Sequence, residues 1–211
     1  QAYQSFNSQL LEEKSTSENI VLDSQKSYSN RFHSSGGNEA YSVMANTLRN
    51  IYGTDVLIAT GNSFTGNVLK AGYTKKMAGN MIMPNSLSAY SSKMRGAELK
   101  ETVNNFVEGY EGGFIPFNRG SLPVLSGISV EVKETDDGYT LSKITKDGKK
   151  VQDNDTFTVT CLAIPKHMEA YPADENIVFD EEDTTVKETW TGSVSDGNAV
   201  LAQPEDYITL R

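Results

Sequence analysis

The chain carries few of the side chains that most often perform chemistry. Its 211 residues include two histidines, His33 and His167, and one cysteine, Cys161. Hydrolysis at two metal ions needs several His and Asp ligands around ions roughly 3.5–4 Å apart. No Asp-x-His, His-x-His or Gly-Asn-His-Asp/Glu pattern occurs, and Gly37-Asn38-Glu39 resembles the last of these without its histidine. The sequence therefore predicts no catalytic residue and no metal site in this chain.

Other catalytic signatures are also missing. The sequence has no Gly-x-Ser-x-Gly elbow, no phosphate-binding Gly-x-x-x-x-Gly-Lys-Ser/Thr loop and no dinucleotide-binding Gly-x-Gly-x-x-Gly. Cys161 lies in the apolar stretch 158–164, which predicts a buried strand thiol and not a nucleophile. His33 stands in a polar stretch typical of surface loops. His167 follows the end of that apolar stretch, where ligand-binding residues often lie, so it is a candidate ligand contact.

The composition indicates one soluble globular domain, because 37% of the residues are hydrophobic and 22% are charged. The net charge of −9 argues against nucleic acid as a partner. No apolar run approaches the roughly 18–20 residues of a membrane span. The acidic run at 174–188 is interpreted as a solvated loop in preference to a calcium site, since it lacks the acid spacing of a twelve-residue calcium loop.

Apolar spacing predicts two helices. From Asn38, apolar or small residues recur at helical intervals as far as Ile51, with Asn38 as the N-cap and Gly53 ending the helix. A second helix begins at Gly96, with Leu99, Val103, Phe106, Val107 and Tyr110 on its buried stripe. A shorter helix is expected at 73–80.

The strands are expected at 55–60, 86–94, 123–135, 139–145 and 157–164, with a weaker one at 185–190. Leu87, Ala89 and Ser91 are predicted to lie on one face of the second of these. Asp136-Asp137-Gly138 and Asp147-Gly148 supply hairpin turns. The order of elements predicts a mixed α/β fold (α+β-like), in which helices are layered on mixed or antiparallel sheets. Residues 1–35 are expected to form an N-terminal linker or arm, and residues 36–211 the domain.

Four segments, in matching order, resemble the C-terminal domain of 5′-nucleotidases. The first two are an opening helix and a strand that runs into an Asn-containing loop. The third combines a Met-Pro pair with a Gly-Ala-Glu-Leu-Lys helix start, and the fourth joins a Ser-Gly pair to a later Thr-Phe-x-Val strand. They are Asn38–Arg49, Thr54–Ser63, Tyr73-Thr74 with Met83-Pro84 and Met94–Lys100, and Val124–Val130 with Thr156–Val159.

This resemblance implies a function. In that family the domain binds the nucleoside part of a nucleotide: two aromatic rings clamp the base, an acid holds the ribose, and Arg and Asn reach the phosphate. Stacking of a base on an aromatic ring contributes about 1–3 kcal/mol. The resemblance further implies that divalent metal ions are held only by a separate N-terminal metallophosphatase domain of the same chain. It places the protein outside a bacterial cell, in the periplasm or on the cell surface.

The same resemblance selects candidate ligand-binding residues, and these positions depart from the family pattern. The first clamp ring falls on Asn85 and the second on Ile164. The family's loop after the strand at 55–60 ends in an arginine, and the matching segment of this chain, 60–65, lacks that arginine. Glu169 is the nearest acid, and Phe64 and His167 are rings that could contact a ligand from new positions. The candidates are therefore Thr60, Asn62, Phe64, Asn85, Ile164, His167 and Glu169.

Two main hypotheses follow, and a purely structural extracellular domain is a third. In the first, the chain is the nucleotide- or nucleoside-binding domain of a 5′-nucleotidase-like hydrolase of nucleotide catabolism and is not catalytic by itself. In the second, it is a non-catalytic secreted or surface binding module that kept the fold and lost the nucleotide site. The first predicts that the loops at 60–66, 84–86 and 164–169 converge on one cleft.

Overall fold

A five-stranded mixed sheet forms the centre of the protein. The computed structural model describes residues 32–33, 37–64, 78–108, 123–136, 138–163, 177–195 and 202–211. Within the sheet, β3 and β9 run parallel, and the other neighbouring strands are antiparallel. The strand order is β10 (Asp180–Glu181), β4 (Ser88–Arg95), β9 (Thr156–Ala163), β3 (Val56–Thr60), β5 (Pro123–Ser126).

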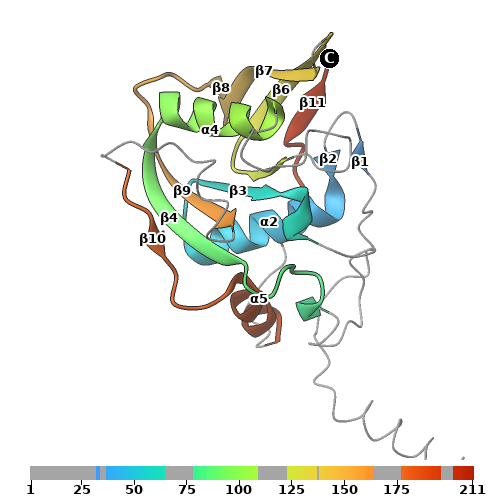
Figure 1. Ribbon diagram of the computed structural model, residues 1–211, viewed down its shortest axis with the longest axis vertical. Helices are drawn as coiled ribbons and strands as arrows, with labels where there is room; N and C mark the ends of the chain where they lie inside the picture. Colours follow the sequence, from blue (N-terminus) through green and yellow to red (C-terminus); the bar gives the residue numbers. More distant parts are fainter. Residues whose placement is uncertain are drawn as a thin grey trace, which may run out of the picture.

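Helices cover both faces of this sheet. In Figure 1, α4 (Gly96–Glu108) lies above the central strands and α2 (Glu39–Tyr52) lies below them. The first four residues of β3 and the last five of β9 are all buried. A strand covered on both faces has no solvent side, so its sequence is a continuous apolar run instead of an alternating one. The predicted mixed α/β fold is therefore confirmed.

A second, four-stranded sheet packs beside the first. Its order is β11 (Ile208–Leu210), β6 (Ser129–Thr135), β7 (Gly138–Lys146), β8 (Lys149–Lys150). The α4 helix lies along β7, where the Leu141 amide donates to Asn104 Oδ1 at 3.1 Å. The predicted turn at Asp147-Gly148 is confirmed, with φ of +50° and +75°. Two left-handed residues in succession are typical of a tight hairpin that matches the strand twist.

The predicted caps of α2 are also confirmed. Asn38 Oδ1 accepts the Tyr41 amide at 3.0 Å, and the Gly53 amide donates to the Arg49 carbonyl at 2.9 Å with Gly53 at φ +67°. Ile51, which closes the predicted stripe, is 38% exposed. The apolar stripe therefore drifts out of the core at the last turn of the helix.

The polar side of α2 is covered by the C-terminal segment 202–207. The Ser42 hydroxyl donates to the Glu205 carbonyl at 2.9 Å and accepts the Glu205 amide at 2.8 Å. Asn46 Nδ2 donates to the Gln203 carbonyl at 2.9 Å. Both helix side chains are buried. They tie the end of the chain to its first long helix and lead it into β11, which pairs parallel with β6.

Two sequence predictions need correction, and the first concerns a strand. The strand predicted at 123–135 is two strands, β5 and β6, because Gly127 turns the chain from one sheet into the other with φ +80°. Both faces of β4 carry buried residues. On the predicted face Ala89 is buried and Ser91 is half-buried, and on the other face Tyr90, Ser92 and Met94 are buried. Met94 points toward α4 and accepts from the Thr102 hydroxyl at 4.0 Å.

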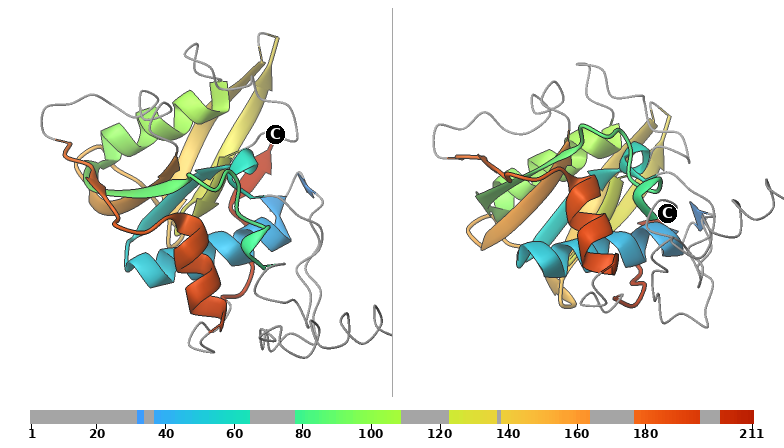
Figure 2. Two further views of the ribbon diagram at one scale, coloured as in Figure 1. Left: turned by 60° about the horizontal axis from the view of Figure 1, so that its bottom comes forward. Right: turned by 90° about the horizontal axis from the view of Figure 1, so that it is seen from below.

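The second correction concerns 185–190, where a strand was predicted and α5 (Val186–Ser195) is found. Figure 2 shows this helix beside α2. Thr185 Oγ1 accepts the Glu188 amide at 3.2 Å, and Glu188 Oε2 accepts the Thr185 amide at 3.0 Å. This reciprocal pair is a capping box, which starts a helix despite the β-branched residues around it. The Thr-x-x-Glu spacing was the signal that the sequence reading missed.

The predictions for Cys161, for the acidic run and for the N-terminal residues have different outcomes. Cys161 is fully buried in β9, as predicted. Asp180, Glu181, Glu182 and Asp183 are exposed, although the first two form a short edge strand. Of the short helix predicted at 73–80, only 78–80 is described. β1 (Phe32–His33) pairs with β2 (Gly37–Asn38), and most of the predicted arm at 1–35 lies outside the described residues.

Candidate functional site

Two strands end and two strands begin at one edge of the central sheet. β3 ends at Thr60 and runs parallel to β9, which ends at Ala163. Ser88, at the start of β4, pairs with Ala163 because β4 and β9 are antiparallel. Pro123, at the start of β5, pairs with Thr60. We call this side of the molecule the β3–β9 edge.

The segments that follow β3 and precede β4 touch each other at this edge. The Met83 amide donates to the Ser63 carbonyl at 3.1 Å. Phe64 and Ile82 form an isolated antiparallel bridge. Thr60 Oγ1 lies 3.2 Å from Ser63 Oγ, which steadies the 3₁₀ turn η1 (Gly61–Ser63). The described part of the predicted 60–66 loop therefore lies beside the residues that lead into the predicted 84–86 loop.

Two candidate side chains at this edge face solvent. Asn62 is exposed in η1, and Asn85 is exposed in the turn before β4. Asn85 Oδ1 accepts from Lys187 Nζ of α5 at 2.8 Å, which leaves its amide nitrogen as a donor for a ligand. Met83, two residues before Asn85, is 45% exposed although it is large and apolar. The sequence reading did not select Met83, because a methionine carries no signal of its own outside an apolar stripe.

Phe64 has a different position. Its side chain is 1% exposed and its ring centroid lies 5.5 Å from that of Tyr41, with an interplanar angle of 42°. The ring therefore anchors the loop after β3 to helix α2. Ile164 follows Ala163 directly, but Ile164, His167 and Glu169 lie outside the described residues. The ligand roles of all seven candidates stay predictions.

The motif at the start of α4 has a structural role. A Cβ on Gly96 would lie 1.8 Å from the Gln152 carbonyl oxygen, so only glycine fits there without a backbone shift. Glu98, 7% exposed, accepts the Arg95 amide at 2.7 Å and pairs with the Arg95 guanidinium at 2.6 Å. The carboxylate occupies the first turn of the helix, where the helix dipole favours negative charge.

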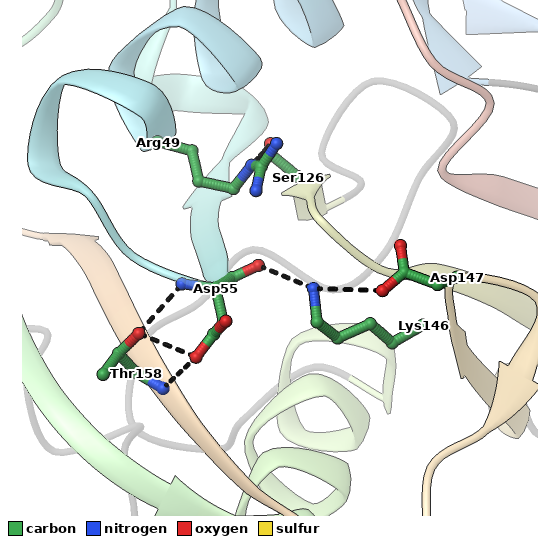
Figure 3. Close-up of polar contacts among 6 residues, drawn as sticks. All are labelled: Arg49, Asp55, Ser126, Lys146, Asp147 and Thr158. Atoms are coloured by element: carbon green, nitrogen blue, oxygen red, sulfur yellow. Dashed lines mark hydrogen bonds and ion pairs between the residues drawn. The ribbon is translucent and has the colours of Figure 1, made fainter.

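The opposite end of β3 holds a polar network, drawn in Figure 3. Asp55 Oδ2 accepts the Thr158 amide at 2.9 Å and the Thr158 hydroxyl at 2.8 Å. These hydrogen bonds, aided by the charges of Lys146 and Arg49, hold the pKa of Asp55 below its usual value. Arg49 Nε donates to Ser126 Oγ at 2.8 Å. This network fastens β3 to β9 and α2 to β5.

Nothing in the described part of the chain fits a metal centre. No three His, Cys, Asp or Glu side chains among these residues come together in a way that could hold an ion. None of the described helices is both long and apolar enough to cross a membrane.

Comparison with known proteins identifies the fold. The model of the 5′-nucleotidase C-terminal domain matches residues 9–164, which is well over half of the chain. The chain belongs to this family. A search of curated protein sequences finds no match.

Solved structures of longer proteins share the fold of this domain. The 5′-nucleotidase precursor of Thermus thermophilus has a TM-score of 0.70 and 11% identity, covering 96% of this chain and 41% of its own. A putative 5′-nucleotidase from Staphylococcus aureus has a TM-score of 0.65 and 15% identity, with coverages of 87% and 39%. The NAD nucleotidase of Haemophilus influenzae has a TM-score of 0.61 and 16% identity, covering 83% of this chain and 34% of its own. The chain thus spans about two fifths or less of each relative.

Proposed function

We propose that this domain binds a nucleotide or nucleoside at the β3–β9 edge and presents it to a metallophosphatase domain elsewhere in the same protein. In this proposal the domain supplies substrate binding, and the partner domain supplies the divalent metal ions and the hydrolytic chemistry. The proposal also places the protein outside the bacterial cell, in the periplasm or on the surface.

The observation that carries the proposal is that the carboxyl ends of β3 and β9 meet the starts of β4 and β5 at one edge, in a chain of this family. Ligands of open α/β sheets commonly bind outside the carboxyl ends of the strands, where loops diverge. Asn62 and Asn85 offer exposed amides there, and amides can hydrogen-bond both a base and a ribose hydroxyl. The exposed thioether of Met83 offers an adaptable apolar contact for a base.

A second function, a binding module without a nucleotide site, is favoured by one observation. Phe64, which could replace a clamp ring, is 1% exposed and packs on Tyr41. The position after Pro84 carries Asn85 instead of a ring. Among the candidate residues that the structure describes, none therefore offers an exposed aromatic face.

Calorimetric titration of the purified chain with AMP, adenosine and UDP-glucose tests the proposal. Asn62→Ala removes an exposed amide at the β3–β9 edge. Asn154→Ala is its matched control, because Asn154 is equally an exposed asparagine but lies before the start of β9, at the opposite edge. We expect saturable binding that Asn62→Ala weakens by about 1 kcal/mol and that Asn154→Ala leaves unchanged.

Either of two results would contradict the proposal. A folded sample that binds none of the three ligands at about millimolar concentration would favour the binding module. Equal effects of the two alanine variants would move the site away from the β3–β9 edge. The partner domain is tested separately: a full-length gene without a metallophosphatase domain would refute the hydrolase part of the proposal.

A further inference from the structure

A polar pocket lies at the other end of β3, away from the β3–β9 edge. Its volume is about 330 Å³, and its walls come from the last turn of α2, the turn between β5 and β6, and the β7–β8 hairpin. The side chains of Arg49 and Lys146 both line it. We infer that this pocket binds a small oxoanion of the size of phosphate. The inference is independent of the proposed nucleotide site.

Both cations keep donor capacity that the described residues do not use. Arg49 commits Nε to Ser126 Oγ at 2.8 Å, and no described acceptor takes its terminal NH2 groups. Lys146 Nζ lies 3.5 Å from the Asp55 carbonyl oxygen and 3.8 Å from Asp147 Oδ2. The side chain of Lys146 is only 22% exposed. A largely covered ammonium with no short hydrogen bond gains from an acceptor that enters the pocket.

The carboxylate of Asp55 does not fill the pocket. Figure 3 shows the carboxylate of Asp55 turned toward Thr158 and away from Arg49. Its Oδ2 is already the acceptor of two hydrogen bonds from Thr158. What Asp55 presents to Lys146 is its main-chain carbonyl oxygen. The two cations therefore face a space that the Asp55 carboxylate leaves open.

The remaining acids lie on the rim and limit the affinity. Asp147, whose side chain is 85% exposed, pairs with Lys146 at 3.8 Å, and such an exposed pair contributes little. Glu205 also lines the pocket and is exposed, while its backbone is held by Ser42. An entering oxoanion displaces the Asp147 contact and is repelled weakly by Glu205. We therefore expect a dissociation constant on the order of millimolar.

The chemistry of the lining favours an oxoanion over other small ligands. A guanidinium presents a planar fork of donors that matches phosphate or carboxylate oxygens, and an ammonium adds a point charge. Gly127 leaves room for the Arg49 side chain beside the turn, because a Cβ at this position would lie 3.1 Å from Arg49 Cδ. The fold thus holds the guanidinium in place before any ligand arrives.

A titration with inorganic phosphate, followed by two-dimensional amide NMR at constant ionic strength, tests the inference. We expect saturable shifts at Gly127, Ile128 and Gly148 and none at Asn62. Lys146→Gln should weaken binding about fivefold, as expected for one unit charge at about 4 Å. Lys149→Gln is the control, because Lys149 is an exposed lysine of the same hairpin that does not line the pocket.

A second variant is expected to bind phosphate more tightly. Glu205→Gln removes a rim charge and should strengthen phosphate binding about threefold. Linear, unsaturable shifts in the wild-type protein would overturn the inference, even if a variant failed to fold. So would equal weakening by Lys146→Gln and Lys149→Gln, since that result indicates general screening. Saturable shifts confined to the β3–β9 edge would overturn it too, and would instead support the proposed nucleotide site.

Discussion

Replacing Gly127 by alanine should destabilise the domain far more than the same change at Gly148. Both glycines are left-handed, with φ of +80° and +75°. A left-handed backbone costs a residue with a Cβ about 1–2 kcal/mol, and both variants carry that cost. Only their surroundings differ. A Cβ on Gly127 would lie 2.1 Å from the Asp55 carbonyl oxygen, whereas a Cβ on Gly148 would meet nothing within 4 Å.

The contact at Gly127 cannot be relieved by a side-chain rotation. The obstructing atom belongs to the backbone, and the adjacent Asp55 amide is held by the Thr158 carbonyl at 3.0 Å. Forcing backbone to shift in a packed region costs about 1–3 kcal/mol. We therefore expect a loss of about 1–2 kcal/mol for Gly148→Ala and about 2–5 kcal/mol for Gly127→Ala. A domain stabilised by about 5–15 kcal/mol would lose a large share of its stability in the second case.

Urea unfolding followed by tryptophan fluorescence measures both variants. The protein has one tryptophan, Trp190, which is fully buried and donates from Nε1 to the Ala78 carbonyl at 3.1 Å. Its emission should therefore change when the fold opens. If the two variants differed by less than about 0.5 kcal/mol, close to the usual error of such comparisons, the argument from steric overlap would be refuted.

Two further predictions concern single interactions. The lowered pKa of Asp55 means that its share of the stability is present above its unfolded pKa of about 3.9 and is lost as the pH falls through the lower folded value. Urea midpoints between about pH 2 and pH 6 should thus fall more steeply in the wild type than in Asp55→Asn, and parallel curves would contradict this. Thr185→Ala should remove the capping box of α5 and cost about 1 kcal/mol in the free energy of unfolding, whereas Thr184→Ala, one residue earlier, should cost less. Equal losses would mean that the box does not support the helix.

The sequence alone determined the elements that have strong local signals. The helix after Asn38 carries its own N-cap, apolar stripe and glycine end, all of which act within a few residues. The apolar runs at 55–60 and 158–164 indicated buried strands. The Gly-Ala-Glu-Leu-Lys start of α4 and the Ser126-Gly127 pair carried the family resemblance.

Only the tertiary structure decided where distant segments meet. No local pattern predicts that Gly127 carries the chain from one sheet to the other, because the turn depends on the Asp55 carbonyl of a different strand. The burial of Ser42 and Asn46 depends on the C-terminal segment, more than 150 positions away in sequence. The sequence suggested that the Phe64 ring could contact a ligand, but in the fold this ring packs against Tyr41. The pocket of Arg49 and Lys146 likewise exists only because a helix end and a hairpin, about 100 residues apart, come together.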